Sequence, residues 1–401
     1  MNRQSLVSVA WIMLFMSAGA PGSPTEYTFI DLHSAAVGNA SGGFGIGDGQ
    51  QVGFGGDAEV HPYLWTGSAA SAVNLSPTAP GQAWGVDGGK QVGWINLEIP
   101  ITHAAVWSGT AASMIDINPP GRDSSAALAI HGDNIVGYAG TEVPEIGTTP
   151  HATLWQGPAH NFIDLHPAGF YYSNAIGVSA NAQVGRGSIG QLDHALMWHG
   201  SADSVIDLHP AGYDSSFAWG MSDTQQVGRG QMEFVGRALL WSGSAQSVID
   251  LHRDEFEGTQ ANDVEGGVQV GTGYRSDGLQ HALAWSGSAD SMIDLHDFVP
   301  PGFLWSLASG IDEEGNIVGF ARTGREDTPS HAVMWVPVTD ASPIPLPAGA
   351  LAGGPVLLIA LITARRRELK WSSRTARRAG RRRRLLSRRT VASRPCRPAW
   401  D

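Results

Sequence analysis

A block of sequence that recurs along residues 27–338 constrains this chain more than any other feature. In its fullest form the block reads His-Ala-x-x-Trp, Ser-Gly-Ser-Ala, Ile-Asp-Leu-His, Ala-x-Gly-Ile and Gln-Val-Gly. Its tryptophans follow one another at intervals of 42 to 50 residues, at Trp65, Trp107, Trp155, Trp198, Trp241, Trp285 and Trp335. That period, built from short apolar runs and glycine turns, is typical of one four-stranded propeller blade.

Spacing inside the block predicts hairpins. The tryptophan precedes the apolar residue of the Ile-Asp-Leu run by 8 residues in six blocks, as from Trp65 to Val73. The apolar residues of Ala-x-Gly-Ile and Gln-Val-Gly are 6 apart in five blocks, as from Val86 to Val92. A constant spacing through Gly, Asn, Asp or Ser indicates a tight turn between antiparallel strands.

Counting these strands predicts an all-β, repeat-built fold, a seven-bladed β-propeller of short four-stranded blades. Tyr27 to Trp335 holds seven Ile-Asp-Leu-like runs and seven tryptophan runs. If a blade begins with the tryptophan run, the N-terminus supplies three strands of one blade and 331–335 supplies the fourth. If it begins with Ile-Asp-Leu, all seven blades are continuous, and the sequence leaves this phase open. The alternative is a β-solenoid, whose repeats are usually shorter.

Both ends of the chain differ from the repeats. Arg3, the apolar run 6–16 and the small residues Ala18 and Ala20 predict a secretory signal peptide. The other end carries prolines, then an apolar run just long enough to span a membrane, then arginines. The predicted parts are a signal peptide (1–23), the repeat domain (24–338), a Pro-rich spacer (339–347), a hydrophobic sorting or transmembrane segment (348–364) and a basic, disordered tail (365–401).

The C-terminal order of parts resembles the PEP-CTERM type of sorting signal, in its Pro-Leu-Pro-Ala variant. The residues that carry the resemblance are Pro345, Leu346, Pro347 and Ala348, followed by Arg365, Arg366 and Arg367. It implies an exosortase-type sorting enzyme as a partner and at least transient anchoring in the membrane. Members of that family normally stop after the arginines, whereas this chain continues to Asp401.

The repeats resemble the HAF-type extracellular repeat family, named for a His-Ala-Phe start. The start is present as His103-Ala104, His151-Ala152, His194-Ala195, His281-Ala282 and His331-Ala332, without phenylalanine at the third place. The resemblance covers residues 27 to about 338 and implies a bacterial protein that is exported or displayed on the cell surface. It does not imply a known activity.

Charge and motifs narrow the function further. The net charge is −12, but residues 365–401 carry 15 basic and 2 acidic residues, so the rest carries −25. An acidic body argues against nucleic acid as a partner, since phosphate binding needs clustered Lys and Arg. The single cysteine, Cys396, excludes disulfides and Cys-based zinc sites from the repeats. Serine-elbow, His-Glu-x-x-His and Walker motifs are missing, and Gly185 to Gly190 follows a strand without a helix after it.

These observations predict no catalytic residue, no metal and no cofactor. Histidine and aspartate recur once per block, and residues spread around a ring by symmetry rarely converge on one ion, so we interpret both as structural. Non-repeated aromatic residues in the loops after Ile-Asp-Leu are better candidates for ligand binding, because they could stack on sugars. They are Phe170, Tyr171, Tyr172, Tyr213, Phe303 and Trp305.

The sequence therefore predicts an exported cell-surface or matrix protein that is not an enzyme. It would act as a binding or scaffold module for polysaccharide or surface proteins. One alternative is a propeller-type glycan hydrolase or lyase, which a cluster of non-repeated acids in one cleft would favour. Another is a purely structural matrix protein without a soluble ligand.

Overall fold

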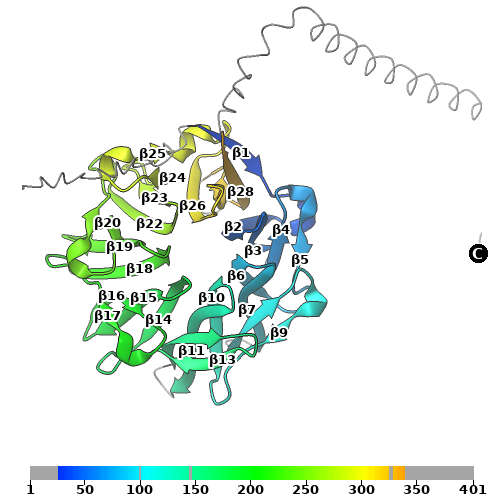
Figure 1. The fold of residues 1–401 in the computed structure, drawn as a ribbon. Helices are drawn as coiled ribbons and strands as arrows, with labels where there is room; N and C mark the ends of the chain where they lie inside the picture. Colours follow the sequence, from blue (N-terminus) through cyan, green and yellow to red (C-terminus); the bar gives the residue numbers. More distant parts are fainter. Residues whose placement is uncertain (1–25, 99–100, 144–146, 325–327, 339–401) are drawn as a thin grey trace, which may run out of the picture. The chain divides into compact units, whose positions relative to one another are not determined.

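The computed structural model describes residues 26–98, 101–143, 147–324 and 328–338. They form seven four-stranded antiparallel sheets around a central channel, so the chain is a seven-bladed β-propeller and the β-solenoid alternative is wrong (Figure 1). The predicted signal peptide, sorting segment and basic tail lie outside the described residues. Within the described ranges no helix is long and apolar enough to cross a membrane.

Each blade begins at the channel with the Ala-x-Gly-Ile strand and ends at the rim with Ile-Asp-Leu. The innermost strands of blades 1 to 7 are β2 (Ala40–Gly47), β6 (Gly81–Asp87), β10 (Ser124–His131), β14 (Ser173–Val178), β18 (Ser215–Met221), β22 (Gly258–Glu265) and β26 (Trp305–Ile311). The second strands are β3 (Gln50–Gly56), β7 (Lys90–Glu98), β11 (Asn134–Val143), β15 (Gln183–Ile189), β19 (Gln226–Met232), β23 (Val268–Tyr274) and β27 (Ile317–Arg322).

The third strands carry the repeat tryptophans: β4 (Val60–Trp65), β8 (Ile101–Trp107), β12 (Gly147–Gln156), β16 (Leu192–Trp198), β20 (Val235–Trp241), β24 (Gln280–Trp285) and β28 (Ser330–Pro337). The outer strands are β5 (Val73–Asn74), β9 (Ile115–Asp116), β13 (Asn161–Asp164), β17 (Ile206–Asp207), β21 (Ile249–Asp250), β25 (Ile293–Asp294) and β1 (Tyr27–Asp31). Short 3-10 helices interrupt the loops: η1 (Ala35–Val37), η2 (Ala69–Ser71), η3 (Ala111–Ser113), η4 (Ala202–Ser204), η5 (Ala245–Ser247), η6 (Ala289–Ser291) and η7 (Leu295–Phe298).

The ring closes in blade 7, which combines both ends of the described chain. Strand β1 pairs antiparallel with β28, from Tyr27 opposite Pro337 to Asp31 opposite Val333, beside β27 and β26. Both phases offered by the sequence are therefore wrong. The C-terminal end supplies three strands and the N-terminal end only the outermost one, because Ala-x-Gly-Ile is the strand that faces the channel.

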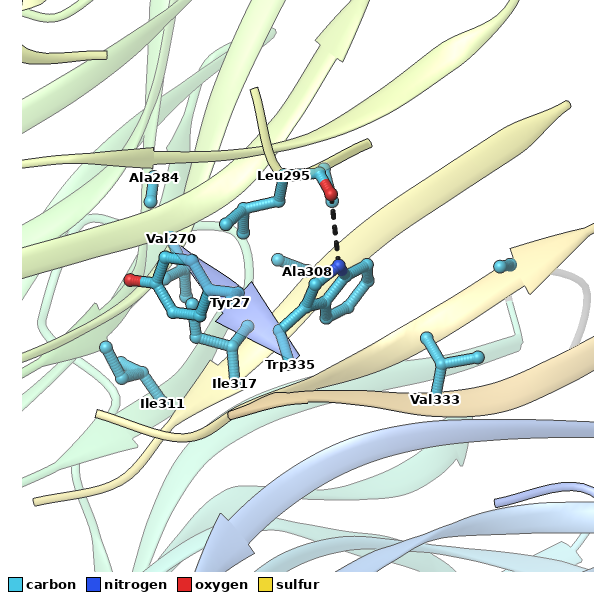
Figure 2. Packing of buried hydrophobic residues seen from close by; sticks show 11 residues of the cluster. Tyr27, Val270, Ala284, Leu295, Ala308, Ile311, Ile317, Val333 and Trp335 are labelled. Carbon is cyan, nitrogen blue, oxygen red and sulfur yellow. Dashed lines mark hydrogen bonds between the residues drawn. The ribbon is translucent and has the colours of Figure 1, made fainter. Parts of the chain in front are cut away.

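The core lies between blades, where each third-strand tryptophan packs against a neighbouring blade. All seven tryptophans are at most 1% exposed, as expected for core residues. Figure 2 shows Trp335 among apolar residues that come from blades 6 and 7 and from β1. Its Nε1 donates to the carbonyl oxygen of Leu295 at 3.1 Å.

Glycine recurs in Gln-Val-Gly because there is no space for a side chain at this position. In blade 5, a Cβ on Gly228 would lie 1.8 Å from the carbonyl oxygen of Phe217 on β18. Equivalent glycines in the other six blades meet the innermost strand at 1.8 to 2.0 Å. A side chain at this point would push the first two strands of the blade apart. The innermost strand also carries a bulge in each blade, between Ala218 and Gly220 in blade 5.

The repeated histidines and aspartates form one hydrogen-bond network per blade, which confirms their structural interpretation. In blade 3, Asp164 accepts the backbone N–H of His166 at 2.9 Å and contacts Nδ1 of His151 at 2.9 Å. Nδ1 of His166 lies 2.8 Å from Oγ of Ser173, which in turn accepts the backbone N–H of Ala152 at 2.9 Å. The network joins the outer loop of one blade to the first strand of the next.

In four of these networks the two imidazole rings stack. Their ring centroids lie 3.9 to 4.2 Å apart in the pairs His33–His331, His151–His166, His194–His209 and His281–His296. Burial, and then the neighbouring imidazole, lowers the pKa of one histidine in each pair, namely His33, His166, His209 and His296. In these four histidines the surroundings therefore favour the neutral imidazole.

Candidate active site

The central channel contains a cavity of about 570 Å³ lined by all seven innermost strands. This volume is within the range of about 300 to 1,000 Å³ that ligand pockets occupy. The residue at the bulge of the innermost strand lines it in each blade, so its identity sets the character of the wall. Five blades place an apolar side chain there and two place a polar one: Phe44, Trp84, Leu128, Ile176 and Trp219, then Asn262 and Ser309.

Aromatic rings dominate the apolar wall. The rings of Phe44 and Trp84, from neighbouring blades, stack with centroids 4.2 Å apart and planes 13° apart. Phe320 meets Phe44 edge-on at 6.4 Å. Each of these rings is half-buried and lines the cavity. A flat apolar surface of this kind suits stacking on a sugar ring or on an aromatic group.

Asp263 is the exceptional residue of the channel. Six blades have glycine or alanine at its place in the repeat, and blade 6 alone has an acid. The adjacent blades leave room for its carboxylate because they keep glycine. A Cβ on Gly220 would lie 2.8 Å from Oδ1 of Asp263, and one on Gly310 would lie 3.6 Å from Oδ2.

The surroundings of Asp263 favour its neutral form. Burial raises its pKa to about 6, and the nearby carboxylate of Glu265 acts in the same direction. Two backbone N–H groups oppose this shift, from Ile311 at 3.1 Å and from Val264 at 2.9 Å. A carboxyl group with this pKa can give up a proton in mildly acidic or neutral water.

Polar side chains continue from Asp263 along blades 6 and 7. Nδ2 of Asn262 donates to the carbonyl oxygen of Ala308 at 2.7 Å, and Nε2 of Gln260 donates to Oδ1 of Asn262 at 3.1 Å. Oγ of Ser309 is buried and has no hydrogen-bond partner within the described ranges. Since no imidazole contacts it there, Ser309 has no base that would make it a nucleophile.

Carboxylates surround one mouth of the channel, at the turns that follow the innermost strands. We call this the acidic rim, and its members line the cavity: Asp48, Asp87, Glu265, Asp312, Glu313 and Glu314. Part of the rim is structural. Oδ2 of Asp48 accepts the N–H of Gly88 at 2.7 Å, and Asp312 accepts three hydrogen bonds within its own turn while burial raises its pKa.

Glu265 is the rim residue best placed to act with Asp263. It lies two residues further along β22, and both residues line the cavity. Two residues along a strand advance about 6.6 Å. Glycoside hydrolases hold their two carboxyl groups about 5 to 9.5 Å apart, a range that side chains on backbone positions this far apart can reach. Over the described residues, no group of three or more His, Cys, Asp or Glu is arranged to hold a metal ion.

The structure spreads the predicted ligand-binding aromatics over blades 4, 5 and 7 rather than gathering them. Phe170 and Tyr213 pack over glycines of their own blades, where a Cβ on Gly187 or Gly230 would meet them at 2.6 and 2.4 Å. Phe303 packs against Phe29, with ring centroids 5.6 Å apart.

The other three lie differently. Tyr171 is 59% exposed, and Tyr172 donates its hydroxyl to Asp193. The ring of Trp305 lies 5.3 Å from Phe320 of the cavity wall. Binding by these six aromatics stays a prediction. Sequence reasoning missed Asp263, although aligning the blocks at Ala-x-Gly would have singled it out.

Comparison with known proteins finds solved structures that share the fold at low sequence identity. No family model matches the sequence, and no curated protein matches it. The chain is similar to a solved puromycin hydrolase, with a TM-score of 0.53 and 8% identity over 76% of this chain and 53% of that one. It is also similar to a puromycin-hydrolyzing peptidase of Mycobacterium tuberculosis, with a TM-score of 0.50 and 11% identity over 78% and 54%.

A Pyrococcus horikoshii acylaminoacyl peptidase follows, with a TM-score of 0.48 and 11% identity over 76% of this chain and 52% of that one. The chain thus spans about half the length of these solved proteins. The predictions of a non-catalytic module and of a protein that is not an enzyme are contradicted by these comparisons, because such propellers occur in hydrolases and peptidases. At identities this low the likeness is one of fold, so the chemistry must be argued from the site.

Proposed function

We propose that this propeller is a hydrolase that cleaves glycosidic bonds in its central channel, by acid/base catalysis between Asp263 and Glu265. The observation that carries the proposal is Asp263, an acid enclosed by neighbouring blades with a pKa of about 6, at a place of the channel where the other six blades have glycine or alanine. Paired carboxylates in unlike environments are the usual equipment of glycoside hydrolases.

Asp263 takes the part of the general acid. Its protonated form gives its proton to the glycosidic oxygen as the bond to the anomeric carbon breaks. The N–H groups of Val264 and Ile311 then stabilise the carboxylate that remains. Burial keeps the proton on Asp263 at a pH where an ordinary aspartate has lost it.

Glu265 takes the part of the general base. It belongs to the acidic rim, where it accepts the N–H of Gly266 at 2.9 Å. In this position it removes a proton from the water that adds to the anomeric carbon. Because the two carboxylates lie in different environments, Asp263 acts as the acid and Glu265 as the base.

The wall of the cavity supports a glycan as the substrate. The stacked rings of Phe44 and Trp84 offer the flat apolar face on which a sugar ring packs, and Asn262 and Gln260 offer amides for its hydroxyls. A peptidase mechanism through Ser309 finds no support, since a nucleophilic serine needs an adjacent base. The signal peptide and sorting segment expected from the sequence support the proposal that this activity takes place outside the cell.

The test is to incubate the full chain with neutral and acidic bacterial polysaccharides and to follow new reducing ends and unsaturated products in parallel. We expect reducing ends without unsaturated products, and a rate that falls above pH 6 as Asp263 loses its proton. Asp263→Asn and Glu265→Gln should each lower the rate by about 100-fold or more. Asp290→Asn, an exposed acid outside the channel, serves as the matched control and should leave the rate unchanged.

Three results would contradict the proposal. Unsaturated products would make the reaction an elimination rather than a hydrolysis. Cleavage of peptides in place of glycans would move the substrate class to that of the similar solved structures. Full activity in Asp263→Asn would remove the residue on which the mechanism depends.

A further inference from the structure

A cluster of arginines and aromatic rings lies beyond the cavity, away from the acidic rim. Arg186 and Arg229 occupy the same place in the repeat, directly after Gln-Val-Gly in β15 and β19. The other five blades have Phe54, Trp94, Tyr138, Thr272 and Phe320 there. Blades 4 and 5 alone therefore carry positive charge at this level of the channel.

Phe217 connects the two arginines. Its backbone is the strand partner of Arg229 across β18 and β19, and its ring lies 5.4 Å from Cζ of Arg186. The same ring lies 5.9 Å from that of Trp219, which lines the cavity. A ligand bound in the cavity can thus extend past Trp219 onto Phe217 and reach both guanidinium groups.

The charge of this cluster is only partly compensated. Arg186 has Asp193 as its nearest carboxylate at 3.8 Å, a distance too long for a hydrogen bond, and Asp193 also accepts the hydroxyl of Tyr172. Arg229 donates from Nη2 to the side chain of Gln231 at 3.0 Å. Across the part of the chain that the structure covers, nothing accepts a hydrogen bond from Nε of either arginine.

These arginines differ from others in the described residues. Arg122 and Arg237 hold Asp164 and Asp250 at 2.7 and 2.6 Å, in close ion pairs that stabilise the blade. Arg186 and Arg229 are instead half-buried residues without a close ion pair in an acidic protein, and the guanidinium group of Arg186 lies over the rings of Tyr172 and Phe217. A planar guanidinium over an aromatic ring suits recognition of a carboxylate on a sugar that stacks on the same ring.

We propose that Arg186 and Arg229, with Phe217 between them, form a carboxylate-binding subsite, and that the substrate is a glycan containing uronic acid. This inference rests on the proposed function and names its substrate class. The uronate carboxylate binds the guanidinium groups, while the neighbouring sugar reaches Asp263 through the cavity. The acidic rim repels the same carboxylate, so it fixes the direction in which the chain enters the channel.

The experiment measures binding apart from catalysis. Calorimetric titration of full-length Asp263→Asn compares a glucuronate-containing oligosaccharide with the same oligosaccharide after carboxyl reduction. We expect the acidic form to bind roughly tenfold or more tightly, since charge-assisted hydrogen bonds to arginine are strong, and we expect salt to weaken this preference. Arg186→Gln and Arg229→Gln should each remove most of the preference and leave binding of the neutral form unchanged.

Further variants separate charge from folding. Arg186→Lys and Arg229→Lys keep the charge without the planar fork and should lose part of the preference. Arg253→Gln, at an exposed arginine paired with Glu255, should lose none. A second titration, with a glutamate-rich peptide, should show no binding that depends on the two arginines.

The outcomes distinguish this inference from the proposed function. Equal affinity for acidic and reduced oligosaccharides, or no binding of either, overturns the subsite. Arginine-dependent binding of the peptide in place of the oligosaccharide overturns the uronate assignment. If the acidic oligosaccharide binds through the arginines but the unmodified chain never cleaves it, the subsite stands and the hydrolase proposal falls.

Discussion

Replacing Asp263 by Asn should stabilise the protein at neutral pH while it removes the proposed catalytic acid. The pKa of Asp263 is about 6 in the folded chain, against 3.8 for an ordinary aspartate. The folded state therefore binds the proton more tightly than the unfolded state, so this residue destabilises the fold increasingly as pH rises from about 4 to 6. Asn keeps an oxygen for the N–H groups of Val264 and Ile311 but carries no charge to bury.

The shift in the pKa of Asp263 gives the size of the expected change in the free energy of unfolding. Each pKa unit corresponds to 1.36 kcal/mol, so the charged form costs about 3 kcal/mol at pH 7 and about half of that at pH 5. This is an upper bound, because part of the Asp263 surface faces the cavity. Where a functional site holds a charge in an unfavourable environment, removing that charge is expected to lower the activity and to raise the stability of the protein.

The assay is urea denaturation of both proteins at pH 7, 6, 5 and 4, followed by tryptophan fluorescence. The free energy difference between variant and parent isolates Asp263, because other titrating groups are common to both. Asp290→Asn controls for loss of an exposed charge and should stay within about 0.5 kcal/mol of the parent at every pH. A destabilised Asp263→Asn at pH 7, or a gain that does not change with pH, would refute the reasoning.

Three further predictions concern the frame of the propeller. The pKa of one histidine in each stacked pair, such as His209, is lowered in the folded state, so its contribution to stability is present above pH 6.5 and is lost as the pH falls. The melting temperature should therefore drop below pH 6, and less steeply in His209→Gln; a flat profile would contradict this. Trp335→Ala leaves a cavity and an unpaired carbonyl at Leu295, so it should lower the free energy of unfolding by about 3 to 5 kcal/mol in urea denaturation. A decrease of less than about 1 kcal/mol would show that the blade 7 closure is dispensable. Phe234 is 98% exposed in a turn, where its φ is 70°. Phe234→Gly should therefore raise the free energy of unfolding by about 1 kcal/mol. A lower free energy of unfolding would reveal a contact that the ring makes.

Several features of the fold follow from local sequence alone. The seven tryptophans gave the blade number, and the constant spacing of their neighbours gave the hairpins, because turn length sets strand pairing within one block. The structural interpretation of the repeated histidines and aspartates also held, since a contact made once per block needs no distant partner beyond the next blade. The membrane-sorting segment and the uses of Tyr171 and Tyr172 stay predictions.

Tertiary structure decided the phase of the blades and the site. Phase depends on which strand faces the channel, and the repeat reads the same from any starting strand until the ring closes with β1 beside β28. The burial that raises the pKa of Asp263 depends on neighbouring blades, where Gly220 of blade 5 and Gly310 of blade 7 lie against its carboxylate. Sequence shows that an acid interrupts a row of small residues. Only the packing of blades 5 and 7 against blade 6 buries that acid, because the groups around it come from other blades and not from its own strand.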